Sequence, residues 1–270
     1  MASQLTNAEK LVHSTVRIEC ELANGQLASG TGFFYNFAIN GNTSVPTIVT
    51  NKHVVAGASK GKIEMTLADA NGNPIEKSRQ IFQLSNFEQL WMPHPEQDVD
   101  LCVMPIAALS QMAEKDNKKL FYVGLNKTLI LTKQQMESLL PMEDITMIGY
   151  PNGIWDQVNN MPVIRRGISA THPSVDWNNK PEFLIDAACF PGSSGSPVFL
   201  FNHGSYPERG GATVLGQRLK LLGILYAGPQ QTVTGEIKII NVPTQNVPIA
   251  VSAIPMNLGM VIKATKLEAF

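Results

Sequence analysis

The feature that most constrains the fold is the recurrence of short runs of β-branched and apolar residues with turn residues between them. Asn24-Gly25 and Asn71-Gly72 are typical hairpin turns between such runs. Short strands at this spacing predict an all-β fold with an antiparallel barrel. The predicted strands span residues 14–22, 26–35, 47–50, 62–67, 79–84 and 99–105 in the first half, and 128–132, 144–149, 163–169, 182–187, 196–201, 220–226 and 238–241 in the second.

Few segments favour helices. Thr6 followed by Glu9 has the spacing of a capping box and predicts a short helix over residues 6–13. Thr132 is a candidate cap for a second short helix that competes with the strand prediction around it. The apolar positions in residues 257–270 share one helical face, so a terminal helix is expected there. These positions are Leu258, Val261, Ile262 and Leu267.

Composition excludes some function classes. The chain of 270 residues is 44% hydrophobic and has a formal net charge of -1, which gives no electrostatic reason to expect nucleic acid or an anionic membrane as a partner. Three sparse cysteines do not form a disulfide framework and favour a reducing compartment. The first residues lack an apolar leader and no run of about 18 apolar residues occurs, so the protein is interpreted as cytoplasmic.

The stretch from Phe190 to Pro197 contains a candidate nucleophile. Ser194 lies between small residues, and Gly192 and Gly195 allow the backbone to expose its hydroxyl and to bring N–H donors beside it. The alternative is an ordinary turn, for which glycine and serine are also typical. An α/β-hydrolase elbow would need a glycine two positions after the nucleophile, where this chain has Ser196.

Two further residues occur in an order that suggests a catalytic triad. His53 follows an apolar run, and Asp100 begins another apolar run. Histidine, aspartate and then Ser194 is the chain order of the chymotrypsin-type triad, and it differs from the orders in subtilisin and in α/β-hydrolases. Asp98 competes with Asp100 for the third role. His94 lies between two prolines and is expected to make a surface-loop contact instead of acting as the base.

On these residues the sequence resembles the trypsin-like serine peptidases, and most closely the bacterial high-temperature-requirement type without an appended peptide-binding domain. The similar segments occur in the family's order over most of the chain. They are Gly30-Thr31-Gly32-Phe33-Phe34, Thr50-Asn51-Lys52-His53-Val54-Val55, Asp100-Leu101-Cys102-Val103, Ile148-Gly149-Tyr150-Pro151, Ile185-Asp186-Ala187-Ala188 through Pro197, and Ala253-Ile254-Pro255.

The resemblance implies a chymotrypsin-like fold of two packed antiparallel six-stranded Greek-key β-barrels. Because residues 106–119 are polar and partly helical, the boundary is expected near residue 115. The N-terminal barrel would span residues 1–115 and carry His53 and Asp100. Residues 116–256 would form the C-terminal barrel that carries Ser194, and residues 257–270 the terminal helix.

The resemblance also implies the roles of the site residues. Ser194 would attack a peptide carbonyl, His53 would act as general base and then acid, and Asp100 would orient the imidazole. The backbone N–H groups of Gly192 and Ser194 would form the oxyanion hole. Such a reaction passes through an acyl-enzyme intermediate, which water then hydrolyses.

The resemblance to the family also implies which residues determine substrate specificity. Ala188 would form the floor of the primary pocket, and Tyr226, Ala227 and Gly228 would line the substrate strand and the pocket entrance. The uncharged floor favours cleavage after an uncharged small or aliphatic residue. The alternative for the strand that contains Tyr226 is that its side chains only pack in the core and do not bind substrate.

No cofactor or metal is expected, because the histidines are scattered and no paired Cys/His spacing is typical of a zinc site. The expected partners are a protein or peptide substrate and, for control, a regulatory protein. Two alternatives remain open at this stage: a catalytically silent or conditionally activated module that binds peptides or proteins, and a hydrolase of esters with the same triad.

Overall fold

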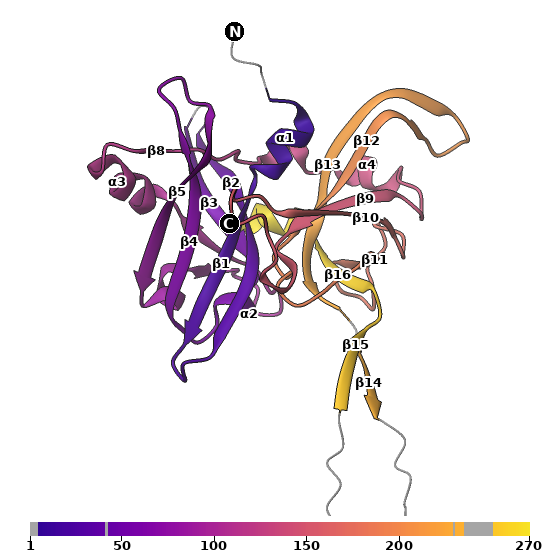
Figure 1. The fold of residues 1–270 in the computed structure, drawn as a ribbon. Coiled ribbons are helices and arrows are strands. Elements are labelled where there is room, and N and C mark those ends of the chain that lie inside the picture. Colours follow the sequence, from indigo (N-terminus) through magenta and orange to yellow (C-terminus); the bar gives the residue numbers. More distant parts are fainter. Residues whose placement is uncertain (1–4, 41–42, 229, 235–250) are drawn as a thin grey trace, which may run out of the picture.

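The computed structural model describes residues 5–40, 43–228, 230–234 and 251–270, and strands dominate these ranges (Figure 1). The mostly β composition confirms the fold class expected from the recurring apolar runs. The strand predicted over residues 238–241 lies outside the described residues.

The first half of the chain forms one eight-stranded sheet with the order β5-β4-β1-β2-β3-β7-β6, in which β8 pairs with β4. The edge strands β5 and β6 do not pair with each other, so the path stays open and the six-stranded closed barrel predicted for this half is wrong. The strands are β1 (Thr15–Leu22), β2 (Leu27–Asn40), β3 (Thr43–Thr50), β4 (Ala58–Ala68), β5 (Pro74–Ser85), β6 (Met92–Pro93), β7 (Cys102–Pro105) and β8 (Lys119–Leu120).

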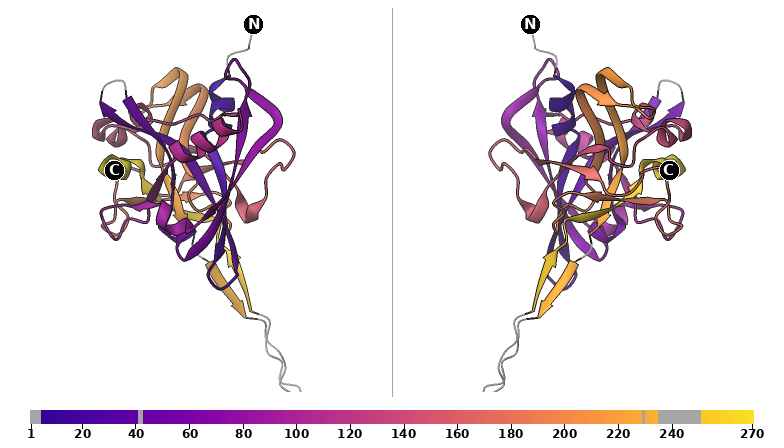
Figure 2. Two further views of the ribbon diagram at one scale, coloured as in Figure 1. Left: turned by 90° about the vertical axis from the view of Figure 1, so that its left-hand side faces the viewer. Right: turned by 90° about the vertical axis from the view of Figure 1, so that its right-hand side faces the viewer.

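The second half contains a closed barrel of six antiparallel strands with the order β10-β11-β16-β13-β12-β9. These are β9 (Asp144–Gly149), β10 (Val163–Ser169), β11 (Glu182–Asp186), β12 (Pro197–Pro207), β13 (Thr213–Ala227) and β16 (Leu258–Lys263). Two further strands, β14 (Gln230–Thr234) and β15 (Val251–Pro255), pair as a separate ribbon that projects away from both halves (Figure 2).

The helices are short, and two of them begin where the sequence predicts. Thr6 and Glu9 form a complete capping box at α1 (Asn7–Val12), and Thr132 and Gln135 form another at α4 (Lys133–Glu137). The other helical segments are α2 (Lys52–Val55), α3 (Ala107–Lys115) and the 3-10 turns η1 (Phe87–Leu90), η2 (Lys127–Leu129), η3 (Pro151–Gly153) and η4 (Ala264–Ala269).

The strand predicted over residues 128–132 is wrong. The side chain of Asn126 accepts the backbone N–H of Thr128 at 3.0 Å and so starts the 3-10 turn η2 at this point. Such local side-chain bonding competes with the pairing of a strand. Only Ile130 keeps a strand-like contact, a single bridge to Leu221.

The terminal helix predicted over residues 257–270 is also wrong. Leu258–Lys263 forms β16, which pairs with β11 on one side and with β13 on the other, and only Ala264–Ala269 is helical, as a 3-10 turn. Val261 and Ile262 are adjacent and both buried, which suits a central strand with two covered faces. Pairing on both sides therefore overrides the helical spacing of the apolar residues.

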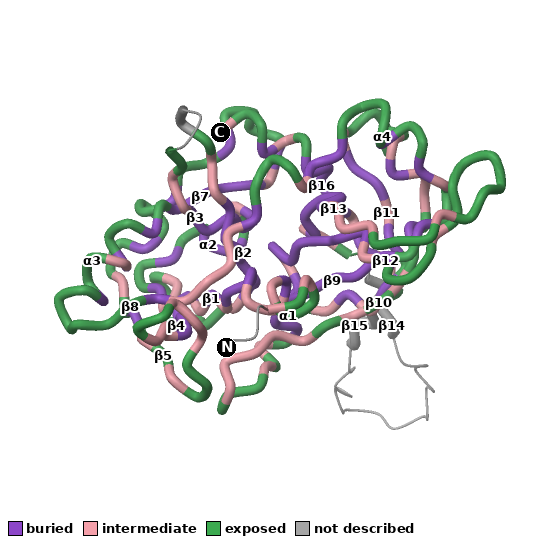
Figure 3. Tube along the Cα trace, turned by 90° about the horizontal axis from the view of Figure 1, so that it is seen from above, coloured by how far each residue is buried: buried purple, intermediate pink, exposed green. Residues whose placement is uncertain are grey.

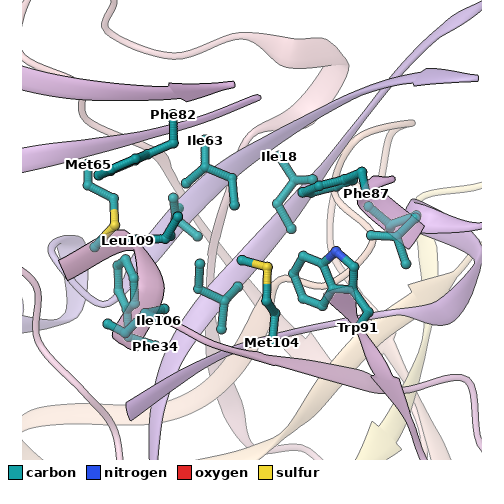
Figure 4. Packing of buried hydrophobic residues seen from close by; sticks show 14 of the residues in the cluster. Ile18, Phe34, Ile63, Met65, Phe82, Phe87, Trp91, Met104, Ile106 and Leu109 are labelled. Atoms are coloured by element: carbon teal, nitrogen blue, oxygen red, sulfur yellow. The ribbon is translucent and has the colours of Figure 1, made fainter. Parts of the chain in front are cut away.

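Three clusters of buried side chains hold the molecule together, and Figure 3 shows the buried stretches running through the strands of both halves. One cluster lies inside the first sheet (Figure 4) and another inside the barrel. The remaining cluster joins the two halves. Its members from the first half are Leu11, Phe33, Tyr35, Val49, Val99, Leu101 and Val103, and those from the barrel include Ile148, Phe199, Leu221, Ile224 and Ile262.

Candidate active site

The antiparallel pairing of β3 with β7 brings His53 and Asp100 together. Thr50 pairs with Cys102 at the end of this ladder. In an antiparallel pair the residues that follow one partner lie opposite those that precede the other. His53 follows Thr50 in α2, and Asp100 precedes Cys102, so residues 47 positions apart in the sequence lie opposite each other.

Asp100 holds His53 at two points. One carboxylate oxygen, Oδ2, lies 2.5 Å from His53 Nδ1, and the other, Oδ1, accepts the backbone N–H of His53 at 3.1 Å. With Nδ1 as donor, the imidazole presents the lone pair of Nε2 away from the carboxylate. The side chains are 48% and 23% exposed, respectively, so a substrate can reach the ring. Asp98, the competing carboxylate, is exposed and makes no hydrogen bond within the described residues.

Ser194 lies in the loop before β12, and two glycines shape that loop. Gly192 and Gly195 have φ angles of 84° and 87°, which side chains other than glycine rarely adopt. A Cβ atom on Gly192 would lie 2.7 Å from the carbonyl oxygen of Tyr150, and one on Gly195 would overlap the backbone of Thr31. Both glycines are therefore required by conformation and by space.

Thr31 on β2 joins this loop to the sheet that carries the histidine. Its N–H donates to the carbonyl oxygen of Ser194 at 2.9 Å, and its hydroxyl donates to the carbonyl oxygen of Gly192 at 3.0 Å. The same hydroxyl accepts the N–H of Tyr150, and the carbonyl oxygen of Thr31 accepts the hydroxyl of Thr50 at 2.7 Å.

Sequence reasoning used Thr31 only as part of a motif and missed this role. A threonine between two glycines inside an apolar run was the available signal, because a buried hydroxyl needs hydrogen-bond partners. Thr50 is three residues before His53, so the chain of contacts through Thr31 places the Ser194 loop beside His53.

The Ser194 hydroxyl has a partner in this structure. It donates to the carbonyl oxygen of Tyr226 at 3.4 Å, and no hydrogen bond joins it to His53 in the described part of the chain. Tyr226 also lies near the aspartate: burial raises the pKa of its phenol, and the hydrogen bond to Glu182 and the charges of Glu182 and Asp100 raise it further. Ser194, Tyr226 and Asp100 thus share one neighbourhood.

The backbone N–H groups of Gly192 and Ser194 have no hydrogen-bond acceptor among the described residues. The carbonyl oxygen of Pro191 accepts the N–H of Asn152 at 2.5 Å, and that of Ser193 accepts the N–H of Ser196 at 3.0 Å. In a planar trans peptide the N–H points opposite to the C=O. The N–H groups of Gly192 and Ser194 are therefore directed away from these partners, and neither donates a hydrogen bond to any described residue.

Among the residues expected to line the primary pocket, Gly228 lies beside Cys189, which follows Ala188 in the chain. The backbone oxygen of Ala188 accepts a hydrogen bond from Arg165, a residue that the sequence did not single out. A Cβ atom on Gly228 would lie 3.7 Å from Cβ of Cys189 and 2.9 Å from the carbonyl oxygen of Leu258. Ala227 pairs with Met260 on β16. Gly228 is exposed.

The three cysteines are poorly suited to act as nucleophiles, because burial raises the pKa of each thiol. Cys20, Cys102 and Cys189 are buried free thiols, and burial raises the pKa of Cys189 to about 11, which makes its thiolate scarce at neutral pH. In the ranges that the structure describes, no cluster of three or more His, Cys, Asp or Glu side chains could hold a metal ion. None of the described helices is long and apolar enough to cross a membrane.

His94 does not make the surface-loop contact expected from its flanking prolines. Its ring is buried, with Nδ1 accepting the N–H of Glu96 and Nε2 lying 3.0 Å from the carbonyl oxygen of Lys266. Its edge packs against Phe270. His94 therefore anchors the C-terminal turn, and both nitrogens are used for structure.

Three comparisons relate this chain to known proteins. The model of a family described as the trypsin-like peptidase domain matches residues 30–205. A search of curated proteins finds no match. Among solved structures, the inactive form of a mutant of Rv3671c from M. tuberculosis H37Rv has a TM-score of 0.44 and 15% identity over 97% of this chain and 85% of that one. The catalytically active tobacco etch virus protease, complexed with product, has a TM-score of 0.46 and 14% identity over 85% and 73% of the two chains.

Proposed function

This chain belongs to the trypsin-like peptidase family, whose model matches more than half of it, and from this premise we propose that it is a serine endopeptidase. Its catalytic residues are His53, Asp100 and Ser194. The reaction is hydrolysis of a peptide bond in a protein or peptide through an acyl-enzyme intermediate, and it requires no cofactor.

The observation that carries the proposal is the double contact of Asp100 with His53. With Nδ1 donating to the carboxylate, Nε2 is free to accept a proton. The Ser194 hydroxyl turns from the carbonyl oxygen of Tyr226 toward Nε2 and attacks the substrate carbonyl as its proton passes to His53. The imidazolium then protonates the leaving amine, and Asp100 stabilises its positive charge.

The N–H groups of Gly192 and Ser194, which have no acceptor among the described residues, supply the oxyanion hole. They are held in place because the carbonyl oxygens of Pro191 and Ser193 are already bonded elsewhere. Donors fixed in advance stabilise the negative charge of the tetrahedral intermediate without reorganising, and one such donor typically contributes about 2.7 to 4 kcal/mol.

Cleavage sites in a protein mixture test this function. Cell extract proteins incubated with the wild-type chain should gain new N-termini that are absent after incubation with Ser194→Ala, because only the former can form an acyl-enzyme. Quantitative mass spectrometry of N-terminal peptides gives both the cleavage events and the residue before each cut. Equal profiles for the two proteins would contradict the proposal.

One observation favours a second candidate, a conditionally activated or silent module that binds peptides. The serine hydroxyl is bonded to Tyr226 instead of His53, so the proton path is not assembled in this structure. An activating partner that binds near the loop could complete it. In the cleavage experiment this candidate predicts activity only after addition of such a protein.

Finer features of the proposal follow from the family resemblance. Ala188 at the pocket floor favours an uncharged small or aliphatic residue before the scissile bond, with Tyr226, Ala227 and Gly228 binding the substrate strand. Greek-key connectivity, boundaries near residues 115 and 256, a cytoplasmic location and a regulatory protein partner are proposed on the same basis. Nucleic acid and membranes are not proposed as partners.

A further inference from the structure

Arg165 lies beside the segment that leads to Ser194. β10 pairs with β11 through Ile168 and Asp186, and the segment that leads to Ser194 follows β11 directly. The guanidinium donates to the backbone oxygen of Ala188 and lies 4.8 Å from the centre of the Phe190 ring. The guanidinium therefore contacts Ala188 and Phe190, the residues before and after Cys189, at the expected floor of the primary pocket.

This cation has no carboxylate partner among the described residues. No described Asp or Glu oxygen lies within 4 Å of the Arg165 guanidinium, and its hydrogen bond to Ala188 uses only one of five N–H donors. The side chain is half-buried, and burial lowers the pKa of the guanidinium. A partly buried charge with unused donors is stabilised by an anionic group that fits against it.

The neighbouring Arg166 differs from Arg165 in both exposure and pairing. Arg166 is on the opposite face of β10, its side chain is 74% exposed, and it lies 3.8 Å from Asp144. Its charge is exposed and lies near a carboxylate, whereas that of Arg165 is half-buried and has no carboxylate partner among the described residues. The two residues thus provide a matched pair for experiment.

We propose that Arg165 is a specificity-determining residue that makes the primary pocket prefer an acidic side chain over its uncharged amide, glutamate over glutamine and aspartate over asparagine. The inference rests on the proposed function, because it takes Ala188 as the floor of the substrate pocket. It modifies the uncharged preference inferred from Ala188 alone, since a cation beside the floor attracts an acidic residue more than a neutral residue of the same shape.

Peptides that differ only in the residue before the scissile bond test this, as matched pairs of Glu and Gln and of Asp and Asn together with an Ala reference. The wild-type chain should have a kcat/KM about 10-fold higher for the acidic member of each pair. Arg165→Met should remove this ratio, Arg165→Lys should keep part of it, and Arg166→Met should leave it unchanged. Cleavage of the Ala peptide should continue in all variants.

Binding measured without turnover separates this inference from the proposed function. In a Ser194→Ala background, calorimetry should give about 10-fold tighter binding of the Glu peptide than of the Gln peptide, and Arg165→Met should abolish the difference. A binding preference without hydrolysis by the wild-type chain would uphold the pocket and contradict the peptidase. Hydrolysis with equal affinities, or an Arg165→Met variant that weakens all peptides equally, would overturn the inference.

Discussion

Ser194→Ala should lower the turnover of a peptide substrate by four to six powers of ten, which corresponds to roughly 5 to 8 kcal/mol of transition-state stabilisation. The methyl group cannot attack a carbonyl, and His53 and Asp100 then have no nucleophile to activate. The effect should be as large as that of His53→Ala, because members of a triad act as a unit. Stopped assays with a quenched fluorescent peptide cover this range of rates.

Folding should not account for the loss. The hydroxyl removed from Ser194 makes one long hydrogen bond, 3.4 Å to the carbonyl oxygen of Tyr226, so the melting temperature should barely move. Ser196→Ala is the matched control: this hydroxyl is in the same loop, is buried, and has no hydrogen-bond partner among the described residues. Turnover by Ser196→Ala should stay within a few-fold of wild type, and a comparable loss there would contradict the assignment of Ser194.

Asp100→Asn should lower kcat by about four powers of ten, the size of effect known for the equivalent change in trypsin-type enzymes. The asparagine oxygen can still accept the backbone N–H of His53, so the loop keeps its geometry. Its NH₂ group, however, donates toward Nδ1, which moves the imidazole proton to Nε2. The ring then has no lone pair facing Ser194 and cannot act as the base.

Asp98→Asn is the control for this change, because Asp98 is exposed and lies two residues away in the same loop. It should leave kcat unchanged. Nuclear magnetic resonance of the imidazole nitrogens reports the tautomer directly, with the proton on Nδ1 in the wild-type chain and on Nε2 in Asp100→Asn. A proton on Nε2 in the wild-type chain would show that Asp100 does not orient the ring.

Local sequence signals were sufficient for much of the fold. The capping boxes at Thr6 and Thr132 and the hairpin turn at Asn24-Gly25 depend on a few adjacent residues, and all three occur in the structure. The predictions were wrong where contacts with residues distant in the sequence determine the secondary structure. β16 is a strand because β11 and β13 pair with it on both sides, and no pattern within its own residues expresses that.

Some residues of the candidate site could likewise be predicted from local patterns, and others could not. The sequence pointed to His53 and Asp100 because one follows and the other begins an apolar run, and to Ser194 because small residues flank it. For Thr31 the sequence held only a weak signal, a threonine between two glycines, because its importance comes from contacts with Gly192 and Ser194 more than 160 residues away. Arg165 was missed for a similar reason, since only the barrel brings β10 alongside Ala188.

Reaction with a fluorophosphonate is the most direct test, because this reagent modifies a serine only where a base activates the hydroxyl and an oxyanion hole stabilises the adduct. Mass spectrometry of the digested protein should locate a single adduct on Ser194, and His53→Ala should slow its formation by orders of magnitude. A folded wild-type chain that forms no adduct at Ser194, or forms it equally fast without His53, would contradict the account.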